Sequence, residues 1–178
     1  MTGAKRETQL VLRAQCGDRE ALESLLRGVQ GRLLRYIAGL AGHDAAEDVL
    51  QDVFLQICRK LEWLRDAELF RPWIYRIASR ASFAYLKKER RWLAGEGEEV
   101  PVEEVPAPPP NMLPGLLDEL TELVEELSPA SRAVLMLHYV QDLSLDEVAA
   151  ILELSPGTVK SRLAYGLACL RKLMERKK

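Results

Sequence analysis

The sequence contains little of what metal sites, disulfides and catalytic centres are made from. Its three cysteines, Cys16, Cys58 and Cys169, are widely spaced and odd in number, and its two histidines, His43 and His138, are far apart. Zinc sites and disulfide frameworks depend on short or paired spacings, so neither is expected. The chain also has no glycine-rich phosphate loop, no HExxH motif and no nucleophile elbow. These absences predict a protein that is not an enzyme and that holds no metal or other cofactor.

Long apolar runs are missing as well. The apolar stretches are short, as at 133–137, whereas a membrane helix needs about 20 predominantly apolar residues. Residues 1–15 are mixed and charged and lack the apolar core of a signal peptide. We therefore expect no membrane insertion and a cytoplasmic location.

The net charge of −2 conceals an uneven distribution along the chain. Residues 1–92 have 17 basic and 12 acidic side chains, residues 93–127 have ten acidic and no basic ones, and residues 128–178 have eight basic and five acidic ones. Both ends are thus compatible with a polyanionic partner, although the total charge alone argues against one.

Apolar residues recur with a helical period through most of the chain, and no segment alternates like a strand. In the first half the pattern predicts helices over about 18–40, 44–64 and 71–92. Asp18 is a plausible N-cap of the first of these helices, and Pro72 suits the first turn of the third.

A segment rich in Pro, Glu and Gly, with no helical period, follows from residue 95. This composition indicates an extended, self-repelling linker. The predicted fold class is therefore all-α, with two small helical domains, at 1–92 and 115–178, joined by a flexible acidic Pro-rich linker at 93–114.

In the second domain, Ser128-Pro129 is expected to cap and begin a helix that continues to Val140. The domain ends in a pattern typical of a helix-turn-helix. Ser144 and Glu147 fit a capping box before a short helix, a tight turn follows at 153–154, and Ser155-Pro156 begins the last helix. The start of the second helix of such a unit enters the DNA major groove. The polar residues offered there are Thr158, Lys160, Ser161, Arg162 and Tyr165. A plain helical hairpin with solvated charges is the alternative.

Two helices of the first domain carry unusual charge. Residues 71–91 include seven basic and one acidic residue, interleaved with aromatics, which suits a surface that follows phosphates and stacks on unpaired bases. An ordinary basic helix with core aromatics is the alternative.

In the helix at 44–64, Asp52 lies two turns from the N-terminus, where the helix dipole no longer favours it. A basic protein partner would explain its presence.

Together these segments resemble the bacterial sigma factors, specifically the extracytoplasmic-function (ECF) group that has only regions 2 and 4. The matching stretches are DAAEDVLQDVFLQI at 44–57, FRPWIYRIA at 70–78 and LSPASRAVLMLHYVQDLSLDEVAAILELSPGTVKSRL at 127–163. The resemblance covers nearly the whole chain outside the linker, and its motifs lie in the expected order on both sides of it.

The resemblance implies binding to the RNA polymerase core, at the β′ clamp helices and the β subunit, and to promoter DNA. It also allows an anti-sigma factor as a partner. Polymerase binding would use Asp48, Gln51, Asp52 and Phe54. Opening and reading of the −10 element would use Arg65, Arg71, Trp73, Arg76, Arg80, Phe83, Lys87 and Arg91. The −35 element would be read by Thr158, Lys160, Ser161, Arg162 and Tyr165.

Some positions depart from the family pattern. This chain has Arg80 and Ala84 where the −10-reading helix of the family often has Asn and a polar or acidic residue, and it has Tyr165 where the recognition helix often has Arg. Because of these departures, we do not infer from the family which promoter sequence this chain reads. Gly166 is a separate feature, and a glycine in mid-helix costs about 1 kcal/mol relative to Ala.

Two other functions fit parts of the pattern. One is a conventional DNA-binding regulator that uses only the C-terminal helix-turn-helix, with 1–92 as a sensing or dimerisation module. The other is a pure interaction protein, such as an antagonist that binds polymerase without DNA. The first leaves the basic-aromatic helix unexplained, and the basic surfaces argue against the second.

Overall fold

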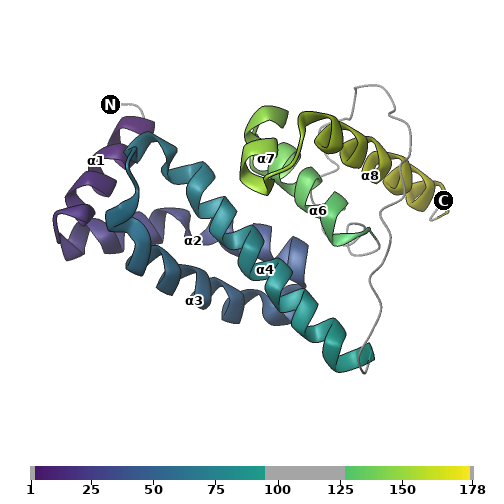
Figure 1. Ribbon diagram of the computed structural model, residues 1–178, viewed down its shortest axis with the longest axis horizontal. Coiled ribbons are helices and arrows are strands. Elements are labelled where there is room, and N and C mark those ends of the chain that lie inside the picture. The colour runs from purple at the N-terminus through teal and green to yellow at the C-terminus, as the bar shows by residue number, and fades with distance from the viewer. Residues whose placement is uncertain (1–2, 95–126, 177–178) are drawn as a thin grey trace.

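The computed structural model describes residues 3–94 and 127–176, and every regular element within these ranges is helical (Figure 1). The first group contains α1 (Gly3–Gln15), α2 (Arg19–Ala41), α3 (His43–Lys60), two 3₁₀ turns, η1 (Leu61–Trp63) and η2 (Ala67–Leu69), and α4 (Phe70–Ala94). The second contains α6 (Pro129–Leu135), the π-helical turn η4 (Met136–Val140), α7 (Leu145–Leu152) and α8 (Pro156–Arg176). In these ranges no helix has the length and apolar character to cross a membrane. The linker predicted at 93–114 lies outside the described residues, except for its first two residues, which end α4.

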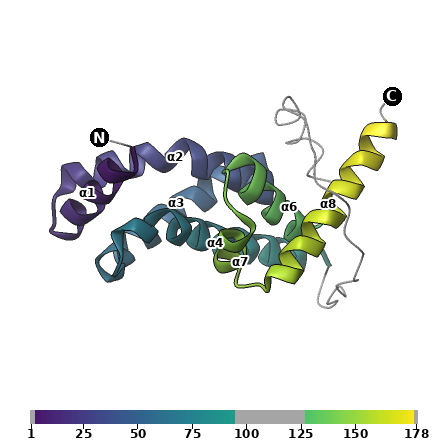
Figure 2. The same cartoon turned by 90° about the horizontal axis from the view of Figure 1, so that it is seen from above.

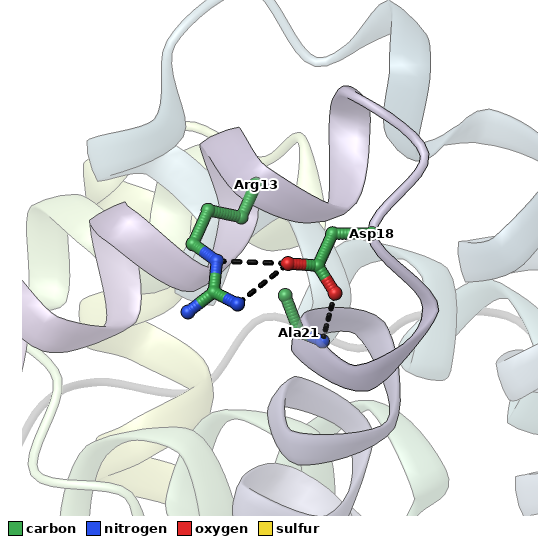
Figure 3. A network of polar contacts seen from close by, with 3 residues as sticks. All are labelled: Arg13, Asp18 and Ala21. Carbon is green, nitrogen blue, oxygen red and sulfur yellow. Dashed lines mark hydrogen bonds and ion pairs between the residues drawn. The ribbon is translucent and has the colours of Figure 1, made fainter.

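Helix α1 is a finding that the sequence pattern did not predict, and Asp18 joins it to α2. One carboxylate oxygen of Asp18 accepts the Ala21 backbone N–H at 3.0 Å, as expected of an N-cap. The other accepts Arg13 Nε and Nη2 at 2.9 and 2.6 Å (Figure 3). The Ala21 hydrogen bond, followed by Arg13, holds the pKa of Asp18 below its usual value. This junction therefore depends on an ionised carboxylate.

The core of the first group is formed by one side each of α2, α3 and α4. Of the apolar residues that recur with a helical period on α2, five are buried, Leu25, Val29, Leu33, Ile37 and Leu40, and Leu22 and Leu26 are half-buried. Val49, Val53 and Ile57 of α3 and Ile74 and Ala78 of α4 are buried with them in one hydrophobic cluster. The helical period in the sequence thus identified the inward faces correctly.

A polar chain crosses this core between α2 and α4. The Ser79 hydroxyl donates to the Tyr75 carbonyl at 2.7 Å and lies 2.7 Å from the Tyr36 hydroxyl. Tyr36 and Ser79 are buried, and the Tyr36 and Tyr75 rings meet edge to face with centroids 5.5 Å apart. Burial raises the pKa of Tyr36. The three residues fix α4 on α2 at one register.

The second group contains the predicted caps. Ser128 accepts the Ser131 N–H at the start of α6, and Ser144 and Glu147 make both hydrogen bonds of the capping box that begins α7. The helix expected to continue to Val140 changes at Met136 into the wider π turn. Gly166 of α8 lies against α6, where a Cβ atom would come within 2.7 Å of Leu135 Cδ1. Close packing of α8 on α6 therefore accounts for this glycine.

The two groups pack against each other, so their cores form one continuous cluster. Helix α6 and the turn η4 lie on α2, while α7 lies on α4, and the far end of α8 points away from the first group (Figures 1 and 2). At Gly39 of α2 a Cβ atom would lie only 2.5 Å from Met136 Cε of η4. The sequence pattern predicted two groups but not this packing.

The polar chain in the first group leads to a stability prediction. Ser79→Ala removes the partner of the buried Tyr36 hydroxyl, so we expect a loss of about 1–3 kcal/mol in the free energy of unfolding. Tyr36→Phe leaves Ser79 bonded to the Tyr75 carbonyl and should cost less. The double variant Tyr36→Phe/Ser79→Ala should be nearly as stable as Tyr36→Phe alone. Urea denaturation measures all three, and additive losses would contradict the coupling.

Candidate nucleic-acid interface

The start of α8 presents a polar face. Thr158, Ser161, Arg162 and Tyr165 follow the i, i+3, i+4, i+7 spacing of one helix face, on the side away from the buried Val159 and Leu170. Tyr165 is 40% exposed. Lys160 is also exposed, but it projects from a different side of the helix, about 100° or more from each of these residues. Four of the five predicted −35 residues therefore share one face.

Two of these hydroxyls also stabilise the start of α8. Ser155 Oγ accepts the Thr158 N–H at 3.1 Å and lies 2.8 Å from Thr158 Oγ1. Ser161 Oγ donates to the Thr158 carbonyl at 3.0 Å. These contacts fix where the helix starts and how its first side chains point. Arg162 is half-buried, and burial lowers the pKa of its guanidinium, which nonetheless stays charged.

The turn before α8 has left-handed backbone at one residue. Glu153 caps α7 with φ 57° and ψ 42°, and its N–H donates to the Ala149 carbonyl. This single residue reverses the chain between α7 and α8 in the helix-turn-helix that the sequence predicted. A glutamate is an uncommon choice there, because glycine and asparagine adopt this conformation more readily.

The basic face of α4 is partly engaged within the protein. Arg76 Nη2 donates to the Ala150 carbonyl of α7 at 2.9 Å, and Arg80 Nη2 pairs with the Glu153 carboxylate at 2.7 Å. Arg71 pairs with Glu7 of α1 at 2.8 Å. Three of the predicted −10 cations thus contact protein groups in this structure.

The other predicted −10 residues divide into two kinds. Arg65 and Lys87 are exposed, whereas Trp73 and Phe83 are half-buried against the hydrophobic cluster. The Arg91 backbone is in the last part of α4, and its side chain lies outside the described residues. Trp63, which no sequence motif indicated, is 74% exposed in η1. Beside it, the Gln15 amide donates to the Leu61 and Leu64 carbonyls at 2.9 and 2.8 Å and holds this turn.

An acidic face runs along α3. Asp48, Gln51 and Asp52 are exposed on one side of the helix. Leu55 continues this side at the same spacing and is 48% exposed, while Phe54 is half-buried and packs on the core. The apolar residue on this surface is therefore Leu55, next to the one that the sequence suggested.

Metal binding has no support in the residues that the structure describes, because no three His, Cys, Asp or Glu side chains among them gather around one point. The chemistry of these surfaces is that of cations, hydroxyls and aromatic rings. Such groups contact phosphates and bases rather than transform them.

Comparison with known proteins gives two family matches. Residues 22–92 match the model of sigma-70 region 2, and residues 117–170 match that of sigma-70 region 4. RNA polymerase sigma factor CarQ of Myxococcus xanthus is 29% identical over 159 residues, covering 89% of this chain and 91% of that protein. The ECF RNA polymerase sigma-E factor of Escherichia coli K12 is also 29% identical, over 86% of each chain.

Two solved structures of similar fold are complexes. One is CnrH with the cytosolic domain of CnrY, at a TM-score of 0.72 and 21% identity, covering 97% of this chain and 99% of the matched chain. Another is the sigma factor RpoE with the anti-sigma factor NepR from Bartonella quintana, at a TM-score of 0.68 and 22% identity, covering 88% and 98%. The likeness spans both helical groups.

Arg71 can have a structural role, through its ion pair with Glu7, or a role in DNA binding, and a test of the ion pair distinguishes the two. Arg71→Ala and Glu7→Ala should each lower the free energy of unfolding, with a coupling energy of about 0.2–1 kcal/mol between them. A double-mutant cycle in urea provides this number. No coupling would mean that the ion pair adds nothing to the fold and would leave Arg71 to the nucleic-acid surface.

Proposed function

Since the chain belongs to the sigma-70 family, as an RNA polymerase sigma factor of the ECF group with regions 2 and 4, we propose which of its surfaces performs each step of initiation. A sigma factor binds core RNA polymerase and directs it to start transcription at promoters. The region 2 match over 22–92 argues against a regulator in which those residues form a sensing or dimerisation module. The proposed domains are 1–92 for region 2 and 115–178 for region 4, with the linker at 93–114 between them.

Region 4 is proposed to read the −35 element through α8. The observation that carries this assignment is the face of Thr158, Ser161, Arg162 and Tyr165, presented by a capped helix directly after the Glu153 turn. An Arg on such a face can donate two hydrogen bonds to a guanine, and the exposed Lys160, on another side of the helix, is suited to a phosphate.

Region 2 is proposed to bind polymerase through α3 and to open the −10 element through α4. Asp48, Gln51, Asp52 and Leu55 form an acidic face with an apolar residue at its C-terminal end, which suits a basic helical surface such as the β′ clamp helices. The cations of α4 and of the preceding turn, Arg65, Arg76, Arg80 and Lys87, suit the phosphates of a strand being separated.

The cellular setting follows from this activity. A protein that acts on RNA polymerase at promoters is proposed to work in the cytoplasm, where bacterial transcription takes place. The anti-sigma partner NepR in the RpoE structure supports an anti-sigma factor as a further partner of this chain.

A transcription assay tests the proposal as a whole. Core RNA polymerase with the purified chain should initiate on a subset of a random promoter library, and the selected sequences should share two elements separated by a fixed spacing. Polymerase alone is the control. No selection above that control would refute the proposed function.

The polymerase face makes a specific prediction about α3. Leu55→Asp replaces the apolar residue of this face with a charge, so we expect assembly with core polymerase to weaken about tenfold or more, which corresponds to about 1.4 kcal/mol. Asp52→Lys should also weaken assembly. The matched control is Leu12→Asp, because Leu12 is 52% exposed on α1. Equal effects of the two aspartates in a fluorescence-anisotropy titration would contradict this face.

The division between the two DNA surfaces predicts different defects. Arg162→Ala should weaken initiation on an intact promoter about tenfold and have little effect on a pre-melted template that lacks the −35 element. Lys87→Ala should reduce use of both templates. Arg171→Ala, an exposed cation farther along α8, is the control. The same defect from Arg162→Ala and Lys87→Ala on the pre-melted template would show that the division is wrong.

A further inference from the structure

We propose that α1 positions the connection between α3 and α4, and that it holds Trp63 where the indole stacks on an unpaired base of the −10 element. This inference rests on the proposed function, because that function assigns the opening of the −10 element to α4, the helix that follows this connection. Helix α1 itself lies outside the residues that match sigma-70 region 2, which begin at position 22. Its role is therefore argued from its contacts.

The connection between α3 and α4 (residues 61–69) begins with the turn η1, which Gln15 of α1 holds at two points. The Gln15 amide nitrogen donates to the Leu61 and Leu64 carbonyls at 2.9 and 2.8 Å. These two residues lie on either side of Trp63 in the chain. Both hydrogens of the amide group are used, so a rotation of the turn breaks at least one hydrogen bond.

A second contact with α1 holds the other end of the connection. Arg71 Nε, in the first turn of α4, pairs with Glu7 Oε1 at 2.8 Å. Between these two anchors, α1 lies beside both 3₁₀ turns, η1 and η2 (Figure 1). The path of the connection is therefore fixed from α1 as well as from the two helices that it joins.

The side chain that this anchored turn presents to solvent is an indole. Trp63 is 74% exposed, although Leu61 in the same turn is buried. No other large hydrophobic side chain in the described part of the chain is as exposed. An aromatic ring left in water gains from a partner that covers its face. An exposed indole on a turn of fixed path is suited to stack on a flat ligand.

The charge of the connection favours an unpaired base as this ligand over duplex DNA. Residues 61–69 include one basic and three acidic side chains. The phosphates of a duplex are repelled by such a segment, whereas a base offers an uncharged aromatic face. The exposed Arg65 is suited to a phosphate beside the stacked base. The connection leads directly into α4, so a strand bound at the first turns of α4 lies next to Trp63.

The two residues have different roles, which variants separate. Trp63 contacts the base, so Trp63→Ala should weaken binding of an unpaired non-template strand by the assembled polymerase about tenfold, the size of one base–aromatic stack. Trp63→Phe keeps a ring and should retain most of the affinity. Gln15 is a positioning residue, and Gln15→Met removes both donors at nearly constant length. It should give a smaller loss than Trp63→Ala and no further loss when combined with it.

The stack itself is measured with 2-aminopurine, a fluorescent base that is quenched when it stacks on an indole. Core polymerase with the full chain is bound to a non-template strand of a selected promoter, with the probe at one −10 position at a time. We expect one position that the parent quenches, that Trp63→Ala restores fully and that Gln15→Met restores in part. Arg13→Ala is the matched control, because it breaks the pair of α1 with Asp18 and leaves the connection untouched. It should change no position.

Three results overturn the inference. Unchanged fluorescence of Trp63→Ala at every −10 position would show that the indole meets no base. Weaker assembly of Trp63→Ala with core polymerase, followed by normal binding of the strand, would show that the indole contacts protein instead. Equal changes at all positions in Gln15→Met would show that α1 stabilises the domain without positioning Trp63. Failure of the parent chain to initiate at all would instead refute the proposed function, so the failures are distinguishable.

Discussion

Helix α4 has to satisfy two environments at once, because one side packs into the α1–α4 bundle and another side meets the second helical group. Ile74 and Ala78 are buried in the bundle, while Tyr75, Arg76 and Arg80 make contacts with η4, α7 and the turn after it. The Ser79 hydroxyl, bonded within the core, sets the rotation of the helix between these sides. The placement of every other surface depends on this rotation, since α3 packs on one flank of α4 and α7 on another.

Helix caps and apolar periodicities in the sequence predicted much of the local structure of the helices. The Asp18 and Ser128 caps, the capping box of Ser144 and Glu147, and the buried stripe of α2 follow from hydrogen bonds and periodicities that span only a few residues. The helix-turn-helix is predictable for the same reason, because two capped helices with a short turn leave few ways to bury their apolar faces. Helix α1 was missed because the inward side of its mixed, charged sequence has few apolar residues, Leu10, Val11 and Ala14, all in its second half.

The packing between the groups was not predictable in this way. Tyr75 appears in the sequence as one more aromatic residue in a basic helix, and only the presence of Gln141 and Tyr36 on either side explains its burial. Met136 and Gly39 are nearly a hundred positions apart, so their fit leaves no periodic trace. On α3 the sequence pattern also did not predict which of two neighbouring apolar residues is exposed. Phe54 and Leu55 differ by about 100° around the helix, and the core rather than the pattern decides which one faces solvent.

The contacts of Arg76 and Arg80 show how the clustered cations of α4 are accommodated within the protein. Clustered cations repel one another, so a free protein gains from placing backbone carbonyls and a carboxylate beside them. The exposed pair of Arg80 and Glu153 contributes little to stability, because water and salt screen it, and the buried Arg76 Nε subtracts from what the neighbouring hydrogen bond provides. The polar part of the interface is therefore close to balanced, and the apolar contacts around Met136 and Leu137 determine whether the groups stay together. The polar contacts of this interface therefore set its geometry, and its apolar contacts provide most of its stability.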